Sequence, residues 1–147
     1  MIEPLRFSFT VECSRQHAFD VWTRRTDSWW PKDHTISNDT NARVTIEPFV
    51  GGRILESAPG GSEHEWGEIV EWQPPQRFAY HWYITSDASD ATFVEIEFQD
   101  IDAGTRIDIN HSGWERLGRG VEMRQLNQGG WDAIIPHFVD ACRSAGI

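Results

Sequence analysis

The stretch from Ile46 to Trp82 decides the fold. Residues 46–54 read IEPFVGGRI, residues 67–78 read GEIVEWQPPQRF, and residues 80–82 read YHW. Gly51-Gly52 predicts a hairpin turn, because glycine adopts positive φ without steric cost, and Pro74-Pro75 predicts a corner between two strands. The segments between these turns alternate like strands. The stretch therefore predicts an antiparallel meander that carries large aromatic side chains.

Further strands are expected on both sides of this meander. Residues 5–11, 94–98 and 105–109 alternate apolar and polar side chains, which is the period of a strand with one solvated face. Between the first strand and the meander, Ser14 is a typical helix N-cap. It precedes an apolar stripe from Ala18 to Trp22, which predicts a short helix, and a second helical turn ends at Pro31.

The C-terminal part predicts one long helix. Its apolar residues fall on a single face at i, i+3, i+4, i+7, i+8 and i+11, namely Trp131, Ile134, Ile135, Phe138, Val139 and Cys142. Gly129-Gly130 and Pro136 disturb this helix, because glycine is a weak helix former and proline removes a backbone hydrogen bond. We favour glycines that allow close helix–sheet packing, with a tolerated kink at the proline. The alternative is a kinked helix that lets a pocket open.

The order of elements is one strand, short helices, six strands and a long helix. It predicts an α+β fold in which one antiparallel sheet curves around the C-terminal helix, with a cavity between the two. A chain of 147 residues is expected to form one domain, over residues 1–147, and to bury a core without covalent staples.

The composition restricts the partners. Thirteen basic and 23 acidic residues give a net charge of −10, which repels nucleic-acid phosphates and anionic membranes, so neither partner is expected. The N-terminus has no signal-peptide pattern, and no apolar run approaches the roughly 20 residues of a membrane span. We therefore expect a cytoplasmic protein. Cys13 and Cys142 are expected to be reduced, mostly buried thiols.

Several motifs carry a resemblance to a known family. They are AFDVWT at 18–23, WWP at 29–31, FVGGR at 49–53, GEIVEW at 67–72, HSGW at 111–114 and GW at 130–131. With Pro75, Arg77 and Phe78, they resemble the START-like, or SRPBCC, superfamily. Within it, they are most similar to the branch named for the activator of heat-shock protein 90 ATPase homologues (Aha-like). The resemblance extends over nearly the whole chain.

This resemblance implies a helix-grip fold, as in START-like and birch-pollen-allergen-like proteins, with a cavity between the sheet and the C-terminal helix. Members of the branch are mostly bacterial. The superfamily contains lipid and hormone carriers, aromatase/cyclases and a few hydrolases, so the fold leaves the function open. The family name also implies chaperone stimulation. That activity belongs to longer eukaryotic members with an additional N-terminal domain, so the resemblance by itself does not transfer it to this chain.

Aromatic side chains are the strongest signal for a site. Eight tryptophans exceed what so small a core needs, and each brings a large apolar surface with one N–H donor. We expect the cavity lining to be Trp22, Trp30, Phe49, Trp66, Trp82, Trp114 and Trp131, with His81 as a polar contact. For each aromatic residue the alternative is a plain core position, and for His81 it is the outer surface of the sheet.

Signals for catalysis or metal binding are weaker. His64 and Glu68 fall four residues apart, but the helical zinc motif needs two histidines at that spacing and this segment predicts a strand. We therefore expect no metal. Glu95, Glu97 and Asp108 lie on predicted strands, where cross-strand pairing with arginine on a solvated face explains them. An acid–base role would require that face to be the concave one.

These observations favour a protein that binds a small apolar or aromatic molecule in its cavity, as a monomer or homodimer and without a cofactor. A cavity enzyme of cyclase or hydrolase type, which would use His81 or a carboxylate, is the first alternative. An interaction module that activates a chaperone ATPase is the second.

Overall fold

The computed structural model of the chain describes residues 2–84 and 90–144. In this part, seven antiparallel strands form one sheet in the order β1-β7-β6-β5-β4-β3-β2. The strands are β1 (Leu5–Val11), β2 (Arg43–Ile46), β3 (Arg53–Ser57), β4 (Glu63–Gln73), β5 (Arg77–Trp82), β6 (Thr92–Ile101) and β7 (Gly104–Ser112). The helical elements are α1 (Arg15–Arg24), α2 (Thr26–Trp29), η1 (Lys32–His34), η3 (Trp114–Arg116) and α3 (Gly120–Ser144).

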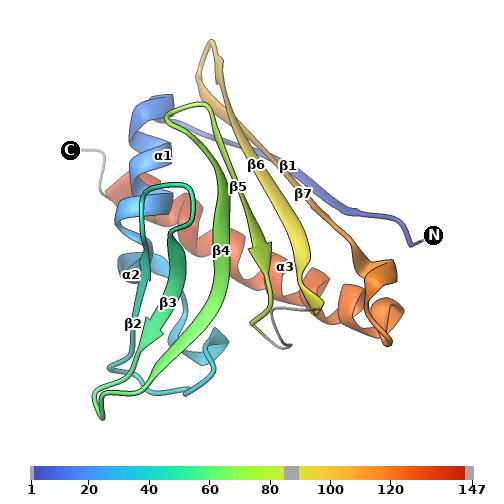
Figure 1. Cartoon of the computed structure of the whole chain (residues 1–147). Helices are drawn as coiled ribbons and strands as arrows, with labels where there is room; N and C mark the ends of the chain where they lie inside the picture. Colours follow the sequence, from blue (N-terminus) through green and yellow to red (C-terminus); the bar gives the residue numbers. More distant parts are fainter. Residues whose placement is uncertain (1, 85–89, 145–147) are drawn as a thin grey trace.

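The sheet curves around α3, with α1 and α2 beside it (Figure 1). This arrangement is the helix-grip fold and confirms the predicted fold class. The strand register explains the inner face, because Phe78 pairs with Ile96, which in turn pairs with Ile109. Side chains at such paired positions lie on the same face of a sheet. The central strands therefore present a continuous apolar surface to the helices.

Aromatic rings fill the space between the sheet and α1. Phe19 on α1 lies 5.2 Å, centroid to centroid, from Phe98 and 5.7 Å from Phe78, both in edge-to-face geometry. Next to it, Trp22 lies 4.6 Å from Phe138 on α3. Phe19, Trp22 and Phe138 are at most 2% exposed. The middle of the molecule is thus a packed core, where such aromatic pairs stabilise the fold beyond the area they bury.

Local signals in the sequence account for the ends of several elements. The Ser14 hydroxyl accepts a hydrogen bond from the backbone N–H of His17 at 3.1 Å and caps α1, as expected. Gly104 begins β7 with φ +149°, and a Cβ there would lie 2.1 Å from the carbonyl oxygen of Val11. Glycine is required at this position because the backbones of β1 and β7 approach too closely for any side chain.

Helix α3 is longer than the apolar stripe that predicts it. The stripe begins at Trp131, whereas the helix begins at Gly120 and continues through Pro136. A Cβ added at Gly129 or Gly130 would meet nothing within 4 Å. The expectation that these glycines permit close helix–sheet packing is therefore wrong, since open space lies next to both of them.

The outer face of the sheet is charged. Arg77 forms ion pairs with Glu71 at 2.9 Å, Glu95 at 3.1 Å and Glu97 at 2.8 Å. The register places Arg77 opposite Glu97 and Ala79 opposite Glu95. The prediction of cross-strand pairing with arginine is confirmed for these two glutamates, and neither lines the apolar pocket described below.

Candidate functional site

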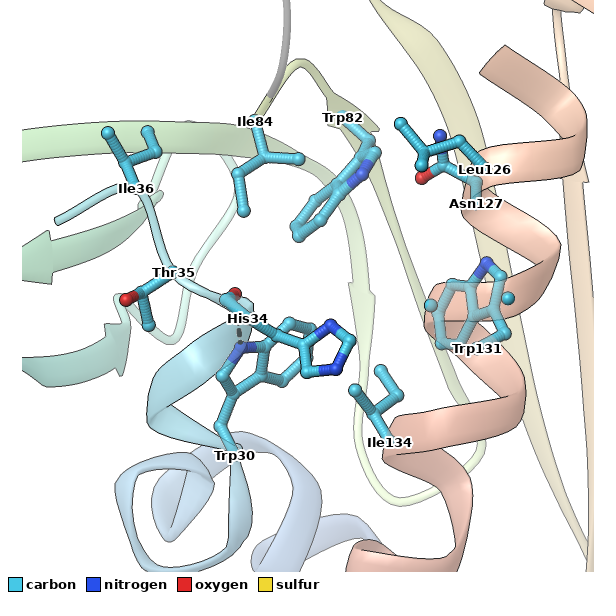
Figure 2. A pocket seen from close by; sticks show the side chains of 12 residues that line it. Trp30, His34, Thr35, Ile36, Trp82, Ile84, Leu126, Asn127, Trp131 and Ile134 are labelled. Carbon is cyan, nitrogen blue, oxygen red and sulfur yellow. Dashed lines mark hydrogen bonds between the residues drawn. The ribbon is translucent and has the colours of Figure 1, made fainter. Parts of the chain in front are cut away.

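A pocket of about 480 Å³ lies where α3, the end of β5 and the segment that follows α2 meet. Figure 2 shows side chains from these three parts of the chain around one open space. The volume is within the range of about 300–1,000 Å³ that is typical of small-molecule sites. Its lining is largely apolar, and it opens to solvent beside the exposed side chains of Ile36 and Leu126.

One wall of the pocket is a face of α3. It consists of Leu126, Asn127, Gly129, Gly130, Trp131 and Ile134. Positions 127, 130, 131 and 134 follow the i, i+3, i+4, i+7 spacing that places residues on one side of a helix. The two glycines expose helix backbone to the pocket, because neither has a side chain and the space beside each is open.

The opposite wall is aromatic. Trp82 and Ile84 come from the end of β5 and the turn after it, and Trp30 follows α2. The indole rings of Trp30 and Trp82 lie 6.2 Å apart at an interplanar angle of 51°. The Trp30 indole N–H donates to the carbonyl oxygen of His34 at 3.0 Å. This bond satisfies the ring's single donor, so an apolar face is left toward the pocket.

A buried histidine, His111 on β7, connects Trp131 in the α3 wall to Trp82 in the aromatic wall. The Trp131 indole N–H donates to Nδ1 of His111 at 3.0 Å. Because Nδ1 accepts, the ring proton sits on Nε2, which donates to the Thr92 hydroxyl at 2.7 Å. That hydroxyl donates in turn to the carbonyl oxygen of Trp82 at 3.2 Å. Burial lowers the pKa of His111 from 6.5 to about 3, so the ring is neutral at pH 7.

A buried carboxylate holds the third wall. Glu56 on β3 is fully buried, and its oxygens accept hydrogen bonds from the backbone N–H groups of Ile36 at 2.7 Å and Ser37 at 2.9 Å. The Trp66 indole N–H donates to it as well, at 3.1 Å. Burial by itself raises the pKa of Glu56, but these hydrogen bonds outweigh it and hold the pKa below 4.5. The charged carboxylate thus fixes Ile36 at the pocket.

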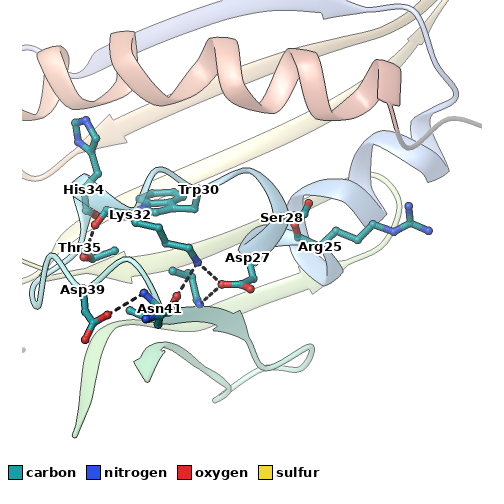
Figure 3. Close-up of polar contacts among 11 residues, drawn as sticks. Arg25, Asp27, Ser28, Trp30, Lys32, His34, Thr35, Asp39 and Asn41 are labelled. Carbon is teal, nitrogen blue, oxygen red and sulfur yellow. Dashed lines mark hydrogen bonds and ion pairs between the residues drawn. The ribbon is translucent and has the colours of Figure 1, made fainter. Parts of the chain in front are cut away.

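The segment between α2 and β2 is also tied at its base (Figure 3). Asp27 accepts hydrogen bonds from the Lys32 ammonium at 2.6 Å and from the backbone N–H of Val44 at 2.9 Å. Lys32 also donates to the carbonyl oxygen of Ala42 at 2.7 Å. Burial raises the pKa of Asp27, yet the contacts with Lys32 and Val44 prevail and lower it. These bonds anchor the residues just before and after the pocket segment.

Among the residues that the structure describes, three polar side chains line the largely apolar pocket. They are His34 and Thr35 on the segment after α2, and Asn127 on α3. The Thr35 hydroxyl is occupied, because it donates to the carbonyl oxygen of Lys32 at 2.8 Å and accepts from the backbone N–H of Asn38. Figure 2 shows the His34 ring projecting from the segment toward Ile134. His34 and Asn127 are thus the polar groups with capacity left for a ligand.

The structure separates the predicted lining residues into three groups, which are pocket residues, core residues, and residues that lie outside both. Trp30, Trp82 and Trp131 line the pocket. Trp22, Trp66 and Trp114 are at most 2% exposed and belong to the packed core. Trp22 and Trp66 contact a separate, very small cavity of about 10 Å³, which is below the volume that a small molecule occupies.

Phe49 and His81 lie outside the pocket lining. Phe49 belongs to the β2–β3 hairpin and is 53% exposed. His81 precedes Trp82 on β5, and neighbouring residues on a strand point to opposite faces, so Trp82 faces the pocket and His81 faces outward. There its ring lies 5.8 Å from Phe93, its partner on β6. The structure thus offers His34, in place of His81, as the imidazole of the pocket.

Several residues around the pocket carried no signal in the sequence. His34, Asn127 and Ile36 are isolated polar or apolar residues without a motif, and contacts between distant segments bring them together. In the sequence, His111 carries a signal only as part of the HSGW motif. A histidine flanked by apolar alternation on a strand that faces the core could have suggested a buried ring.

The two thiols lie side by side, at the junction of β1 and α1 and near the end of α3. Both are free cysteines, and Cys142 is buried while Cys13 is half-buried. Burial raises the pKa of each thiol, and for Cys142 the neighbouring Cys13 adds to this increase. A raised pKa keeps a thiol protonated and poorly nucleophilic at neutral pH.

Two structural features are absent from the part of the chain that the structure describes. Residues 2–84 and 90–144 contain no group of three or more His, Cys, Asp or Glu side chains placed to hold a metal ion. In the same part of the chain, no helix has the length and apolar character needed to cross a membrane.

Solved structures of other proteins share this fold. An AHSA1-like protein from Aeromonas hydrophila superimposes with a TM-score of 0.69 at 16% identity, covering 97% of this chain and 94% of that one. Protein NE0264 from Nitrosomonas europaea gives a TM-score of 0.66 at 13% identity, over 97% and 96% of the two chains. At such low identity these likenesses show the fold alone.

A third structure is closer in sequence. It is an anthrahydroquino-γ-pyrone synthase, Txn09, complexed with SUM. It is 34% identical, with a TM-score of 0.59, over 84% of this chain and 85% of that chain. No curated protein matches the sequence.

The family is settled by a match over most of the sequence. The family model described as "Activator of Hsp90 ATPase homolog 1-like protein" matches residues 12–142. That range runs from the end of β1 nearly to the end of α3, so it includes all three walls of the pocket. The family and the helix-grip fold fit a ligand-binding SRPBCC domain. The chain belongs to the family of Activator of Hsp90 ATPase homolog 1-like proteins.

Proposed function

We propose that this protein binds a small apolar or aromatic molecule in the pocket between α3, the end of β5 and the segment after α2. The observation that carries the proposal is the pocket itself, with a volume of about 480 Å³ and walls that include three indole rings. Burial of apolar ligand surface against such walls provides the main binding free energy, and a few polar groups orient the ligand.

A direct test uses the protein's own fluorescence. Because Trp30, Trp82 and Trp131 line the pocket, a bound aromatic ligand should change the tryptophan emission, and the melting temperature should rise progressively as ligand concentration increases. A panel of lipophilic aromatic compounds serves as probe. If no compound in the panel changes either signal, the proposal fails.

A matched pair of variants locates the binding. Leu126 and Val121 are both exposed side chains of α3, at 62% and 69%, but only Leu126 contacts the pocket. Leu126→Glu places a charge at the opening and should weaken binding of an apolar probe by roughly tenfold, because that charge must be desolvated. Val121→Glu should leave binding unchanged. Equal effects of the two substitutions on probe affinity would show that the probe binds outside this pocket.

A cavity enzyme is the second candidate, and the 34% identity to a synthase favours it. Among the described residues that line the pocket, His34 carries an imidazole, the side chain that enzymes use most often as general acid or base. The test is incubation with the substrate of Txn09 and analysis of products by mass spectrometry. His34→Gln should abolish turnover while binding of the substrate persists; turnover that survives this substitution would remove His34 from the chemistry.

A further inference from the structure

Asn127 presents a free acceptor to the pocket. Its side-chain Nδ2 donates to the carbonyl oxygen of Met123, one turn earlier in α3, at 2.8 Å. This bond fixes which end of the amide is which, because a carbonyl can only accept. Among the residues that the structure describes, Oδ1 of Asn127 has no hydrogen-bond partner. A ligand next to this atom is stabilised by an O–H or N–H donor of its own.

His34 offers a second polar contact. Its ring Nε2 lies 4.0 Å from the Asp33 carboxylate, which is beyond hydrogen-bond distance. Within residues 2–84 and 90–144, neither nitrogen of this ring forms a hydrogen bond. A neutral imidazole has one donor and one acceptor nitrogen, so it can bind either a hydroxyl or a carbonyl oxygen of a ligand.

The glycines of α3 leave the helix backbone uncovered in the α3 wall of the pocket. Glycine weakens a helix, and it is usually explained there by close packing against another element. Neither Gly129 nor Gly130 has that explanation, because a Cβ at either position would meet nothing within 4 Å. Gly130 shares the pocket-facing side of the helix with Asn127 and Ile134. The absent side chain leaves room for a flat group to lie directly on the helix backbone.

We infer that the pocket selects a planar, fused-ring aromatic molecule that carries a hydroxyl group. One ring face lies on the backbone at Gly130, the other faces the indoles of Trp30 and Trp82, and the hydroxyl donates to Oδ1 of Asn127. His34 binds a second oxygen of the same molecule. This inference rests on the proposed ligand-binding function and adds the shape and the hydrogen-bonding group of the ligand.

Three probes of similar size separate shape from hydrogen bonding. They are 2-hydroxyanthraquinone, which is planar and hydroxylated, 2-methylanthraquinone, which is planar without a hydroxyl, and 2-hydroxytriptycene, which is hydroxylated but not planar. Titration calorimetry should show that 2-hydroxyanthraquinone binds roughly three- to tenfold more tightly than 2-methylanthraquinone, the usual effect of one hydrogen bond. The non-planar probe should bind most weakly.

Variants of Asn127 test the hydrogen bond. Asn127→Leu keeps the size of the side chain and removes the acceptor, so the preference for the hydroxylated probe over the methylated one should disappear. Asn127→Asp keeps an acceptor at the same place and should retain the preference. A preference that survives in the leucine variant would overturn the assignment of the hydroxyl to Asn127.

A variant of Gly130 tests whether the ligand lies on the backbone of α3. Gly130→Ala adds one methyl group to open space, so the variant is expected to fold, while its affinity for 2-hydroxyanthraquinone should fall by roughly tenfold, as for one methyl group of misfit. Asp132→Ala, on an exposed position outside the pocket lining, is the control and should bind normally. Unchanged affinity in Gly130→Ala would exclude a ligand on the helix backbone.

The outcomes separate this inference from the proposed function. If none of the three probes binds and the wider aromatic panel also fails, the ligand-binding function itself is wrong. If all three probes bind with equal affinity at the pocket, as reported by Leu126→Glu, the function stands and the inferred selectivity is wrong.

Discussion

The indole N–H of Trp131 donates to Nδ1 of His111 at 3.0 Å, which joins a pocket residue on α3 to a fully buried ring on β7. This single bond sets the tautomer of the histidine and the orientation of the tryptophan. The position of Trp131 in the pocket wall therefore depends on His111, a residue that does not line the pocket.

Replacement of His111 by leucine should destabilise the protein. The substitution removes the acceptor of the Trp131 N–H, and an unpaired buried donor costs about 1–3 kcal/mol of unfolding free energy. Urea unfolding, followed by tryptophan emission, measures the loss. His137→Leu, at an exposed position of α3, should change stability by less than about 0.5 kcal/mol. A leucine variant as stable as the wild type would show that the buried bond contributes nothing.

The same histidine should make stability depend on pH. Burial lowers its pKa in the folded state to about 3, against 6.5 for an unperturbed histidine. The unfolded chain therefore takes up this proton first. The contribution of neutral His111 to the unfolding free energy is complete above pH 6.5 and decreases as the pH falls toward 3. Between pH 7 and pH 5, unfolding free energy should fall by about 2 kcal/mol from this group. His111→Leu should lose that part of the slope, and a parallel decline in both proteins would contradict the assignment.

Glu56→Gln should destabilise the segment that carries Ile36. The carboxylate accepts three N–H groups, whereas an amide has a single acceptor oxygen and would direct its own N–H₂ group at donors. We expect a loss of about 3 kcal/mol in unfolding free energy, since hydrogen bonds to a charged group are stronger than neutral ones. Hydrogen exchange should also show earlier opening around Ile36 and Ser37. Unchanged exchange there would mean that Glu56 does not hold this wall.

Alanine at the helix glycines should have the opposite effect on stability. Gly129→Ala and Gly130→Ala add a methyl group to open space, so each should raise the unfolding free energy by roughly 1 kcal/mol through helix propensity. Gly120→Ala is the contrasting variant, because its Cβ would lie 2.1 Å from the carbonyl oxygen of Trp114 and should destabilise the protein. Thermal melts distinguish the two cases. Destabilisation by Gly130→Ala would show that the space beside it is filled.

The two thiols should react slowly in the folded protein. Burial raises the pKa of Cys13 and of Cys142, so few thiolates are present at pH 8. Alkylation by iodoacetamide, followed by mass spectrometry, should be at least about tenfold slower in native protein than in urea. Rapid labelling of either cysteine in the native state would contradict a protonated, shielded pair.

Local patterns were sufficient for the strands and for the helices α1 and α2. The alternation at residues 94–98 and 105–109 follows from one buried face, and a cap at Ser14 is predictable because serine is a preferred N-cap residue whose hydroxyl bonds to a backbone N–H three residues on. The start of α3 was less visible, since its first turns after Gly120 carry exposed residues such as Val121 and Glu122 and lack an apolar stripe. Where burial does not pattern a helix, the sequence gives little sign of it.

The pocket was harder to predict because it depends on which side of each element faces inward. Trp82 and His81 are neighbours on β5, so both could not line one cavity, and the pattern alone did not say which would. His34 reaches the pocket because Glu56, more than 20 residues away along the chain, holds the adjoining Ile36 and Ser37. Such long-range hydrogen bonds have no periodic signature.

Each wall of the pocket is fastened before any ligand arrives: α3 through His111, the strand through Thr92, and the segment after α2 through Glu56 and Asp27. A preorganised receptor spends little conformational entropy on complex formation. Ligands that match the shape of the pocket should therefore gain affinity chiefly through slower dissociation. The backbones of the free and the ligand-bound protein should superimpose closely.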